Sequence, residues 1–141
     1  MESSSTVRSK DVLVQALINL MAGEGFEIKG AIGIPGQEPP PPITNTGFGA
    51  AHDRRPDVIG FDHDHHRIIF GLVREDRLSL DSEESLEEYN VFLDHNASLG
   101  DRASLVYVMM PEDLVGEFTS LVTHYIHRDY WHRLIAVGSP R

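Results

Sequence analysis

Charged and histidine side chains gather in one stretch of the chain, residues 55–74, which reads RPDVIGFDHDHHRIIFGLVR. Asp57 stands before one apolar run, Arg74 closes a second run, and Asp62–His66 lie between them. Imidazole and carboxylate groups together bind Zn²⁺, Ni²⁺ or Cu²⁺. Adjacent side chains in a turn between two strands point apart, so we expect only adventitious metal binding by the three histidines of this turn.

A second histidine pair, His124 and His127, has the spacing of one helical turn and could share a metal ion. The helix dipole also favours a histidine near the last turn of a helix without any metal, and we expect that role here. The chain has no cysteine, which excludes disulfides, thiolate zinc sites and cysteine nucleophiles. It also lacks the Gly-x-Ser-x-Gly elbow of serine hydrolases.

The elements that must position Asp57 and Arg74 are two strands, predicted at 58–62 and 67–74. The polar turn 62–66 joins them, so they form an antiparallel hairpin. Residues two apart on a strand share a face, so the side chains of Leu72 and Arg74 are expected to point the same way.

Helices and further strands are expected on both sides of this hairpin. Hydrophobic periodicity predicts helices at 10–22, from Asp81 onward, and from Pro111 onward, with strands at 26–31, 104–110 and 130–137. The core side of the last helix is predicted to carry Leu114, Phe118, Leu121, Val122 and Tyr125. The order α-β-β-β-α-β-α-β indicates an α/β fold with a central mixed β-sheet flanked by helices. Residues 1–9 are expected to be a flexible tail and 10–141 a single domain.

A long irregular connection is expected over residues 32–55, because it holds several glycines and the run Pro39–Pro42. Proline supplies no amide donor, so this stretch suits neither a helix nor a central strand. A connection of this length in a small domain is unusual. We expect its residues 33–42 to be an exposed polyproline ligand for a partner domain or a spacer over the surface.

The hairpin resembles the PD-(D/E)XK nuclease superfamily, on the residues Pro56-Asp57 and Gly71-Leu72-Val73-Arg74. The core of that superfamily is a helix, three strands, a helix and a strand, which corresponds to residues 10–110 here. The resemblance therefore implies a restriction-endonuclease-like fold. It also implies that the connection 32–55 lies beside Asp57, as a lid or a partner-binding loop. In such proteins the strand pair typically reads Pro-Asp-Val and then Gly-Glu-x-Lys. The Asp and Glu hold a divalent metal ion that activates water and neutralises phosphate charge, and the Lys assists.

Two of the three catalytic positions are substituted in this chain. Asp57 matches the first carboxylate, the Glu position falls on Leu72, and the Lys position falls on Arg74. Leucine removes a metal ligand, and arginine has no accessible neutral form with which to activate water. Glu88, on the following helix, is the candidate for a migrated carboxylate, so Asp57 and Glu88 are the candidate ligands for Mg²⁺ or Mn²⁺.

The formal charge of −10, from 12 Lys and Arg against 22 Asp and Glu, opposes unaided binding to nucleic acid. Nine of the acids lie between Glu75 and Asp101, against the single base Arg77. Together with the two substitutions, this charge predicts a degenerate, non-catalytic superfamily member that acts as a structural or regulatory binding subunit. The alternative is a Mg²⁺- or Mn²⁺-dependent nuclease with a rearranged active site.

The expected partner is another protein or a second copy of the chain, with nucleic acid disfavoured by the net charge. Without an apolar segment long enough to span a membrane, and without an apolar leader, the sequence predicts a cytoplasmic protein with no membrane partner.

Overall fold

A five-stranded mixed sheet is the centre of the computed structural model, which describes residues 10–44, 53–80, 82–95 and 97–139. Its strands in spatial order are β1 (Glu27–Ala31), β4 (Val58–Asp62), β5 (Arg67–Val73), β6 (Leu105–Pro111) and β7 (Leu134–Ser139). The pairs β1–β4 and β4–β5 are antiparallel, whereas β5–β6 and β6–β7 are parallel. Parallel neighbours need crossover connections, which the helices supply. The predicted α/β class with a mixed sheet is confirmed.

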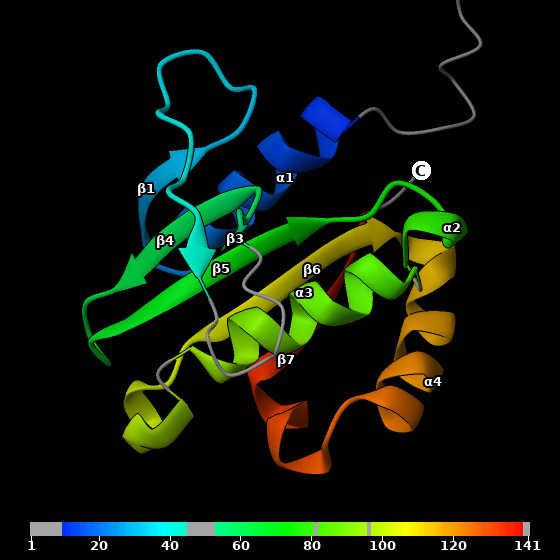
Figure 1. The fold of residues 1–141 in the computed structure, drawn as a ribbon. Coiled ribbons are helices and arrows are strands. Elements are labelled where there is room, and N and C mark those ends of the chain that lie inside the picture. Colours follow the sequence, from blue (N-terminus) through cyan, green and yellow to red (C-terminus); the bar gives the residue numbers. More distant parts are fainter. Residues whose placement is uncertain (1–9, 45–52, 81, 96, 140–141) are drawn as a thin grey trace, which may run out of the picture.

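Helices cover both faces of the sheet (Figure 1). They are α1 (Lys10–Gly23), the short α2 (Arg77–Leu80), α3 (Glu83–Asp94) and α4 (Val115–Tyr125). Three 3₁₀ segments, η2 (Ala97–Arg102), η3 (Glu112–Leu114) and η4 (Arg128–Arg133), complete the connections. α1 packs on the side of β1, β4 and β5, while α3 and α4 pack on β6 and β7 from the opposite side.

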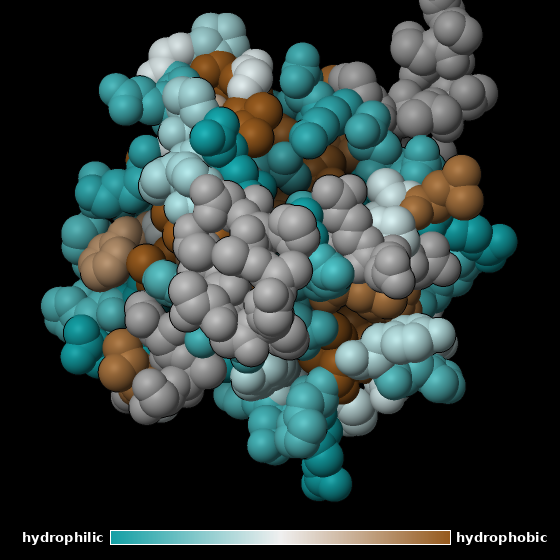
Figure 2. All heavy atoms as spheres, viewed as in Figure 1, coloured by the Kyte–Doolittle hydropathy of each residue, from teal (hydrophilic) through white to brown (hydrophobic). Residues whose placement is uncertain are grey.

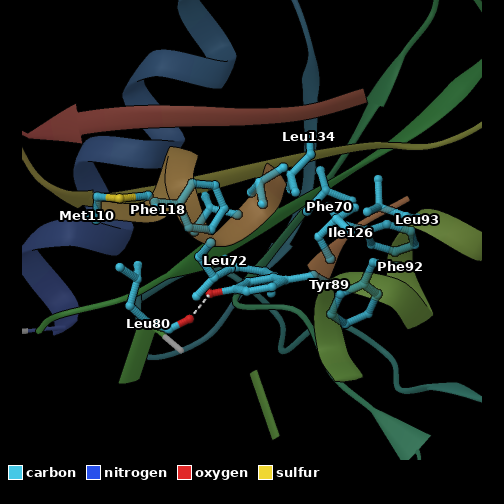
Figure 3. Packing of buried hydrophobic residues seen from close by; sticks show 14 of the residues in the cluster. Phe70, Leu72, Leu80, Tyr89, Phe92, Leu93, Met110, Phe118, Ile126 and Leu134 are labelled. Atoms are coloured by element: carbon cyan, nitrogen blue, oxygen red, sulfur yellow. Dashed lines mark hydrogen bonds between the residues drawn. The ribbon is translucent and has the colours of Figure 1, made fainter. Parts of the chain in front are cut away.

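Alternate residues of the buried strands enter two separate cores. In β6, Val106, Val108 and Met110 join the core beneath α3 and α4, and Leu105, Tyr107 and Met109 join the core beneath α1. All seven residues of β6 are buried, as expected for a strand covered on both faces. The core beneath α3 and α4 is centred on Phe70, Tyr89, Phe92 and Phe118 (Figure 3).

α1 packs closely on the sheet at Gly71. A Cβ atom placed there would lie 2.8 Å from Cδ2 of Leu17 and 3.0 Å from Cβ of Val58. The glycine therefore serves helix packing, and it fixes how close α1 comes to the end of β5.

The structure corrects two predicted helix starts. α3 begins at Glu83, and its N-cap is Ser82, whose hydroxyl oxygen accepts the N–H of Ser85 at 3.1 Å. Asp81, the predicted cap, lies outside the described residues. Pro111 is the last residue of β6 rather than the first residue of a helix, and the turn η3 separates it from α4.

The C-terminal part of the chain departs from the sequence expectation in two places. Phe118, Leu121 and Val122 are buried as predicted, whereas Tyr125 is 66% exposed because α4 ends there and its last turn extends past the core. Residues 128–133, partly predicted as strand, form η4, and β7 starts only at Leu134.

The proline-rich connection 32–55 contains no helix and no strand of the main sheet in its described part. Its first portion folds back on β1, where the N–H of Ala31 donates to the carbonyl of Glu38 at 2.9 Å. The two-residue strands β2 (Ile43–Thr44) and β3 (Asp53–Arg54) then pair with each other. Arg54 forms an ion pair with Glu87 of α3, so this connection returns along the α3 side. Residues 45–52, like the tail 1–9, lie outside the described residues.

Replacing Gly71 by alanine is expected to lower the free energy of unfolding by about 1–3 kcal/mol, the usual cost of forcing an extra methyl group into a packed core. Gly116, inside α4, has open space where a Cβ would stand, with no atom within 4 Å. Gly116→Ala should therefore be neutral or stabilising by up to about 1 kcal/mol through helix propensity. Urea denaturation of both variants measures the difference. Equal changes in the free energy of unfolding for Gly71→Ala and Gly116→Ala would contradict the close packing of α1 on the sheet at Gly71.

Candidate functional site

Asp57 lies immediately before β4, and its backbone is held by strands on either side. Its N–H donates to the carbonyl of Gly71 at 2.9 Å, and its own carbonyl accepts the N–H of Ile32 at 2.9 Å. Val58 pairs with Gly71 in the hairpin, so Asp57 stands opposite Leu72. The beginning of the proline-rich connection thus lies beside Asp57, as the sequence predicted.

The carboxylate of Asp57 is buried, and each of its oxygens has a partner within the chain. Oδ2 accepts the N–H of Val73 at 2.9 Å, and Oδ1 forms an ion pair with Nζ of Lys10 at 3.0 Å. Lys10 is the first residue of α1 and its side chain is 47% exposed, so the ammonium closes the outer side of the carboxylate. The sequence analysis missed Lys10, because only the packing of α1 on the hairpin brings it to Asp57.

Leu72 lies in the core and offers no ligand to the site. Its side chain is 1% exposed, and it packs in the cluster that includes Leu80, Tyr89 and Phe118 (Figure 3). Leu72 therefore stabilises the attachment of α3 and α4 to the sheet through burial of apolar surface.

Arg74 shares the α3 side of the sheet with Leu72, as predicted, and its guanidinium group is held by α3. Nη2 donates to Oε1 of Glu88 at 2.7 Å, and Nε donates to the hydroxyl of Tyr89 at 3.1 Å. Burial alone would lower the pKa of Arg74, but its interactions with Tyr89 and Glu88 raise that pKa above its ordinary value. The guanidinium therefore stays charged. Glu88, the candidate migrated metal ligand, is paired with Arg74.

Tyr89 connects Arg74 to the backbone. Its hydroxyl donates to the carbonyl of Leu80 at 2.8 Å, and the guanidinium carbon of Arg74 lies 5.1 Å from the centre of its ring. Burial raises the pKa of Tyr89 above its ordinary value, although Arg74 acts in the opposite direction. A neutral phenol can donate one hydrogen bond and accept another, and here it does both.

Lys10 and the Arg74–Glu88 pair border one open pocket of about 470 Å³ beyond the carboxyl end of β5. Its lining residues come from α1, the end of β5, α2 and α3: Lys10, Val73, Arg74, Glu75, Asp76, Leu78, Ser79, Ser82, Ser85 and Glu88. The pocket brings Lys10, the partner of Asp57, together with the Arg74–Glu88 pair. Within the part of the chain that the structure describes, no group of three or more His, Asp or Glu side chains is arranged to hold a metal ion.

The histidines of the turn 62–66 point to different partners, as the sequence predicted. Nδ1 of His65 lies 2.8 Å from Oδ2 of Asp62, while Nε2 of His63 lies 2.6 Å from Oε1 of Glu27 on β1. Asp62 also accepts the N–H groups of Asp64 and His65 and the Nε of Arg67. The buried carboxylate of Asp62 therefore organises the turn, and the turn holds β1 to the hairpin through His63.

His124 and His127 do not converge. Nδ1 of His124 lies 2.8 Å from the carbonyl oxygen of Ser120, whereas Nδ1 of His127 accepts the N–H of Asp129 at the start of η4. α4 ends at Tyr125, so the helical spacing on which the pairing depended is lost before His127.

Comparison of the chain with family models, curated proteins and solved structures finds no match. In the described residues, no helix is long and apolar enough to cross a membrane.

Removing the carboxylate of Asp57 should cost stability. Asp57→Ala leaves the buried N–H of Val73 without its acceptor and Lys10 without its counter-ion, so we expect a loss of about 1–3 kcal/mol in the free energy of unfolding. Asp57→Asn keeps an acceptor for Val73 and should lose less. Denaturant titration of both variants is the measurement. An unchanged Asp57→Ala protein would show that these contacts contribute nothing.

Asp62 should make the fold sensitive to acid. Burial would raise the pKa of Asp62, but hydrogen bonds from His65 and Arg67 outweigh it and lower the pKa below its usual 3.8. A lowered pKa in the folded state means that the stabilisation is present above the unfolded value and is lost as pH falls through the folded value. The stability difference between the native chain and Asp62→Asn should therefore shrink below about pH 4.

Chemical denaturation at neutral pH and near pH 3, with Asp64→Asn as the control, tests this dependence. Asp64 is exposed at the surface of the same turn, so its variant should track the native chain at both pH values. A difference between the native chain and Asp62→Asn that is constant with pH would contradict the assignment.

Proposed function

We propose that this chain is a degenerate, non-catalytic relative of the PD-(D/E)XK nucleases that acts as a structural or regulatory binding subunit. The observation that carries the proposal is that neither of the two positions where a metal ion would need a carboxylate offers a free one. Asp57 is neutralised by Lys10, and the facing position is Leu72, which lies in the core. A divalent cation needs several oxygen ligands, and this pair of positions supplies one engaged carboxylate.

The element order supports the likeness to that superfamily. α1, the three strands β1, β4 and β5, then α3 and β6 follow the helix, three strands, helix, strand order of the superfamily core. Asp57 at the start of β4 and residues 72–74 at the end of β5 are adjacent in the sheet, as the motif requires. This likeness concerns the arrangement of elements, and the proposed restriction-endonuclease-like fold rests on it.

The charges in the pocket also favour binding over cleavage. Two carboxylates, Asp57 and Glu88, are matched by two fixed cations, Lys10 and Arg74, at 3.0 and 2.7 Å. A divalent ion held by Asp57 and Glu88 would have to displace both of these cations from the two carboxylates. Arginine also lacks a neutral form that could accept a proton from water. The donor set therefore does not fit Mg²⁺ or Mn²⁺ as it stands.

One observation favours the alternative of a rearranged nuclease. Glu88 and Arg74 line the same pocket as Lys10, the partner of Asp57, so opening both ion pairs would free two carboxylates near one space. In that case Asp57 and Glu88 would hold the metal ion and Arg74 would contact phosphate. A cleavage experiment distinguishes the two functions.

The surface agrees with a protein partner better than with a nucleic acid. The formal charge is −10, and most of the coloured residues on the face in Figure 2 are hydrophilic, with the apolar ones in separate patches. A phosphate backbone would meet net repulsion at low salt, whereas a basic protein surface would be attracted. We therefore place the binding function toward a protein, or toward a second copy of the chain.

The test is incubation of the purified chain with plasmid and with single-stranded DNA in Mg²⁺ and in Mn²⁺. We expect no cleavage, and no rise in melting temperature on adding Mn²⁺, because Asp57 and Glu88 are each already paired with a cation of the chain. Asp57→Ala controls for contaminating nuclease. Cleavage by the native chain that disappears in Asp57→Ala would overturn the proposal and establish the alternative.

A further inference from the structure

β7 is the last strand of the five-stranded sheet, and its outer edge has no neighbouring strand within the described residues. An edge strand presents a row of backbone N–H and C=O groups that can pair with a further strand. β7 is in continuous register with β6 over six residue pairs, from Leu134 to Ser139, without a bulge. Its pairing along β6 is therefore uninterrupted.

The sequence of β7 has none of the features that protect sheet edges. It reads LIAVGS, with no charged residue and no proline. Natural edge strands usually carry lysine, proline or a bulge that prevents pairing with another chain. Six apolar or small residues without a charge form a surface that favours strand addition.

The opposite edge of the same sheet shows such protection. β1 carries the exposed charged residues Glu27 and Lys29, and its register with β4 is interrupted between Ile28 and Gly30. The outward N–H of Ala31 is taken by the carbonyl of Glu38. The chain thus closes one edge of its sheet and leaves the other open.

Side chains beside the open edge are only partly covered. Ile135 and Val137 pack against the core beneath α1 but are partly exposed, because α1 lies mainly over β1, β4 and β5. Trp131, three residues before β7, is 42% exposed. Large exposed aromatic residues are frequent anchors of protein interfaces.

The symmetry of a self-pairing fixes the orientation of an added strand. Antiparallel pairing of β7 with its own copy brings the amino end of one strand beside the carboxyl end of the other. This is the arrangement that a two-fold axis between the copies produces, because the axis exchanges the two strands and reverses their direction.

We propose that the chain forms a two-fold symmetric dimer in which β7 pairs antiparallel with β7 of a second copy, which continues the sheet across the interface. A two-fold interface uses the same patch on both copies, and a bare strand edge is complementary to itself. The pairing involves six residues and a few flanking side chains, so we expect a dissociation constant on the order of micromolar. This proposal does not depend on whether the Asp57 pocket is catalytic.

Sedimentation velocity of the full chain at physiological ionic strength, from about 1 to about 200 µM, measures the association at the affinities expected for a small interface. We expect a monomer–dimer equilibrium that Val137→Lys weakens at least about tenfold, because a charge on the edge must be buried or displaced. Val12→Lys, an equal change of charge on the exposed side of α1, should leave the equilibrium unchanged. Thermal melting of both variants shows whether each is folded.

A cysteine scan keeps the test independent of the folding of Val137→Lys. The chain has no cysteine, so single replacements at Ile135, Ala136 and Val137 each introduce the only thiol. An antiparallel two-fold pairing brings residues near the axis close to their own copies, so oxidised dimer should form most readily at the positions nearest the axis and less readily away from it. A chain that stays monomeric at every concentration, or a dimer that both lysine variants leave unchanged, would overturn the proposal.

Discussion

The contact of the Asp57 carboxylate with the Lys10 ammonium joins α1 to the hairpin at the point where the candidate site lies. Backbone packing sets its position, because Gly71 lets α1 approach the sheet closely. The ion pair between Arg74 and Glu88 attaches α3 in the same way, and each cation lies against a carboxylate that a metal ion would otherwise need. Burying a charge is tolerated when it is paired and hydrogen-bonded. The pocket is thus organised without a metal ion, which is the physical basis of the proposed binding role.

Local sequence patterns are sufficient to predict most of the fold. The predicted strand 58–62 coincides with β4, and the predicted helix 10–22 differs from α1 by one residue. These elements have strong periodicity and clear turn signals on both sides. Proline suits a first helical turn, which misplaces Pro111 in a helix, yet parallel pairing with Ser139 extends β6 to that residue. Tyr125 is predicted to face the core because it continues the helical periodicity, but periodicity does not indicate how far along the helix the core extends.

The candidate site is predictable only in part, because its ion pairs form between residues far apart in the sequence. The motif locates Asp57, Leu72 and Arg74, and the strand period places the last two on one face. Nothing local indicates that Lys10, at the start of α1, reaches Asp57, or that Glu88 faces Arg74 rather than a metal ion. Residue types alone thus leave Asp57 and Glu88 as candidate metal ligands, whereas the tertiary contacts pair each of them with a cation of the chain.

The two edge strands of the sheet differ in their contacts: β1 is hydrogen-bonded to the segment that follows it, whereas β7 has no neighbouring strand on its outer side within the described residues. The segment after β1 folds back on it, since the N–H of Ala31 donates to the carbonyl of Glu38. In the same segment, the N–H of Ile32 donates to the backbone carbonyl of Asp57. The edge next to the candidate site is therefore fixed in place by the chain itself. β7 lies at the far edge, separated from β5 by β6, and none of its residues lines the pocket. An added strand there would extend the sheet without disturbing Asp57, so assembly through β7 and binding at the pocket can operate together.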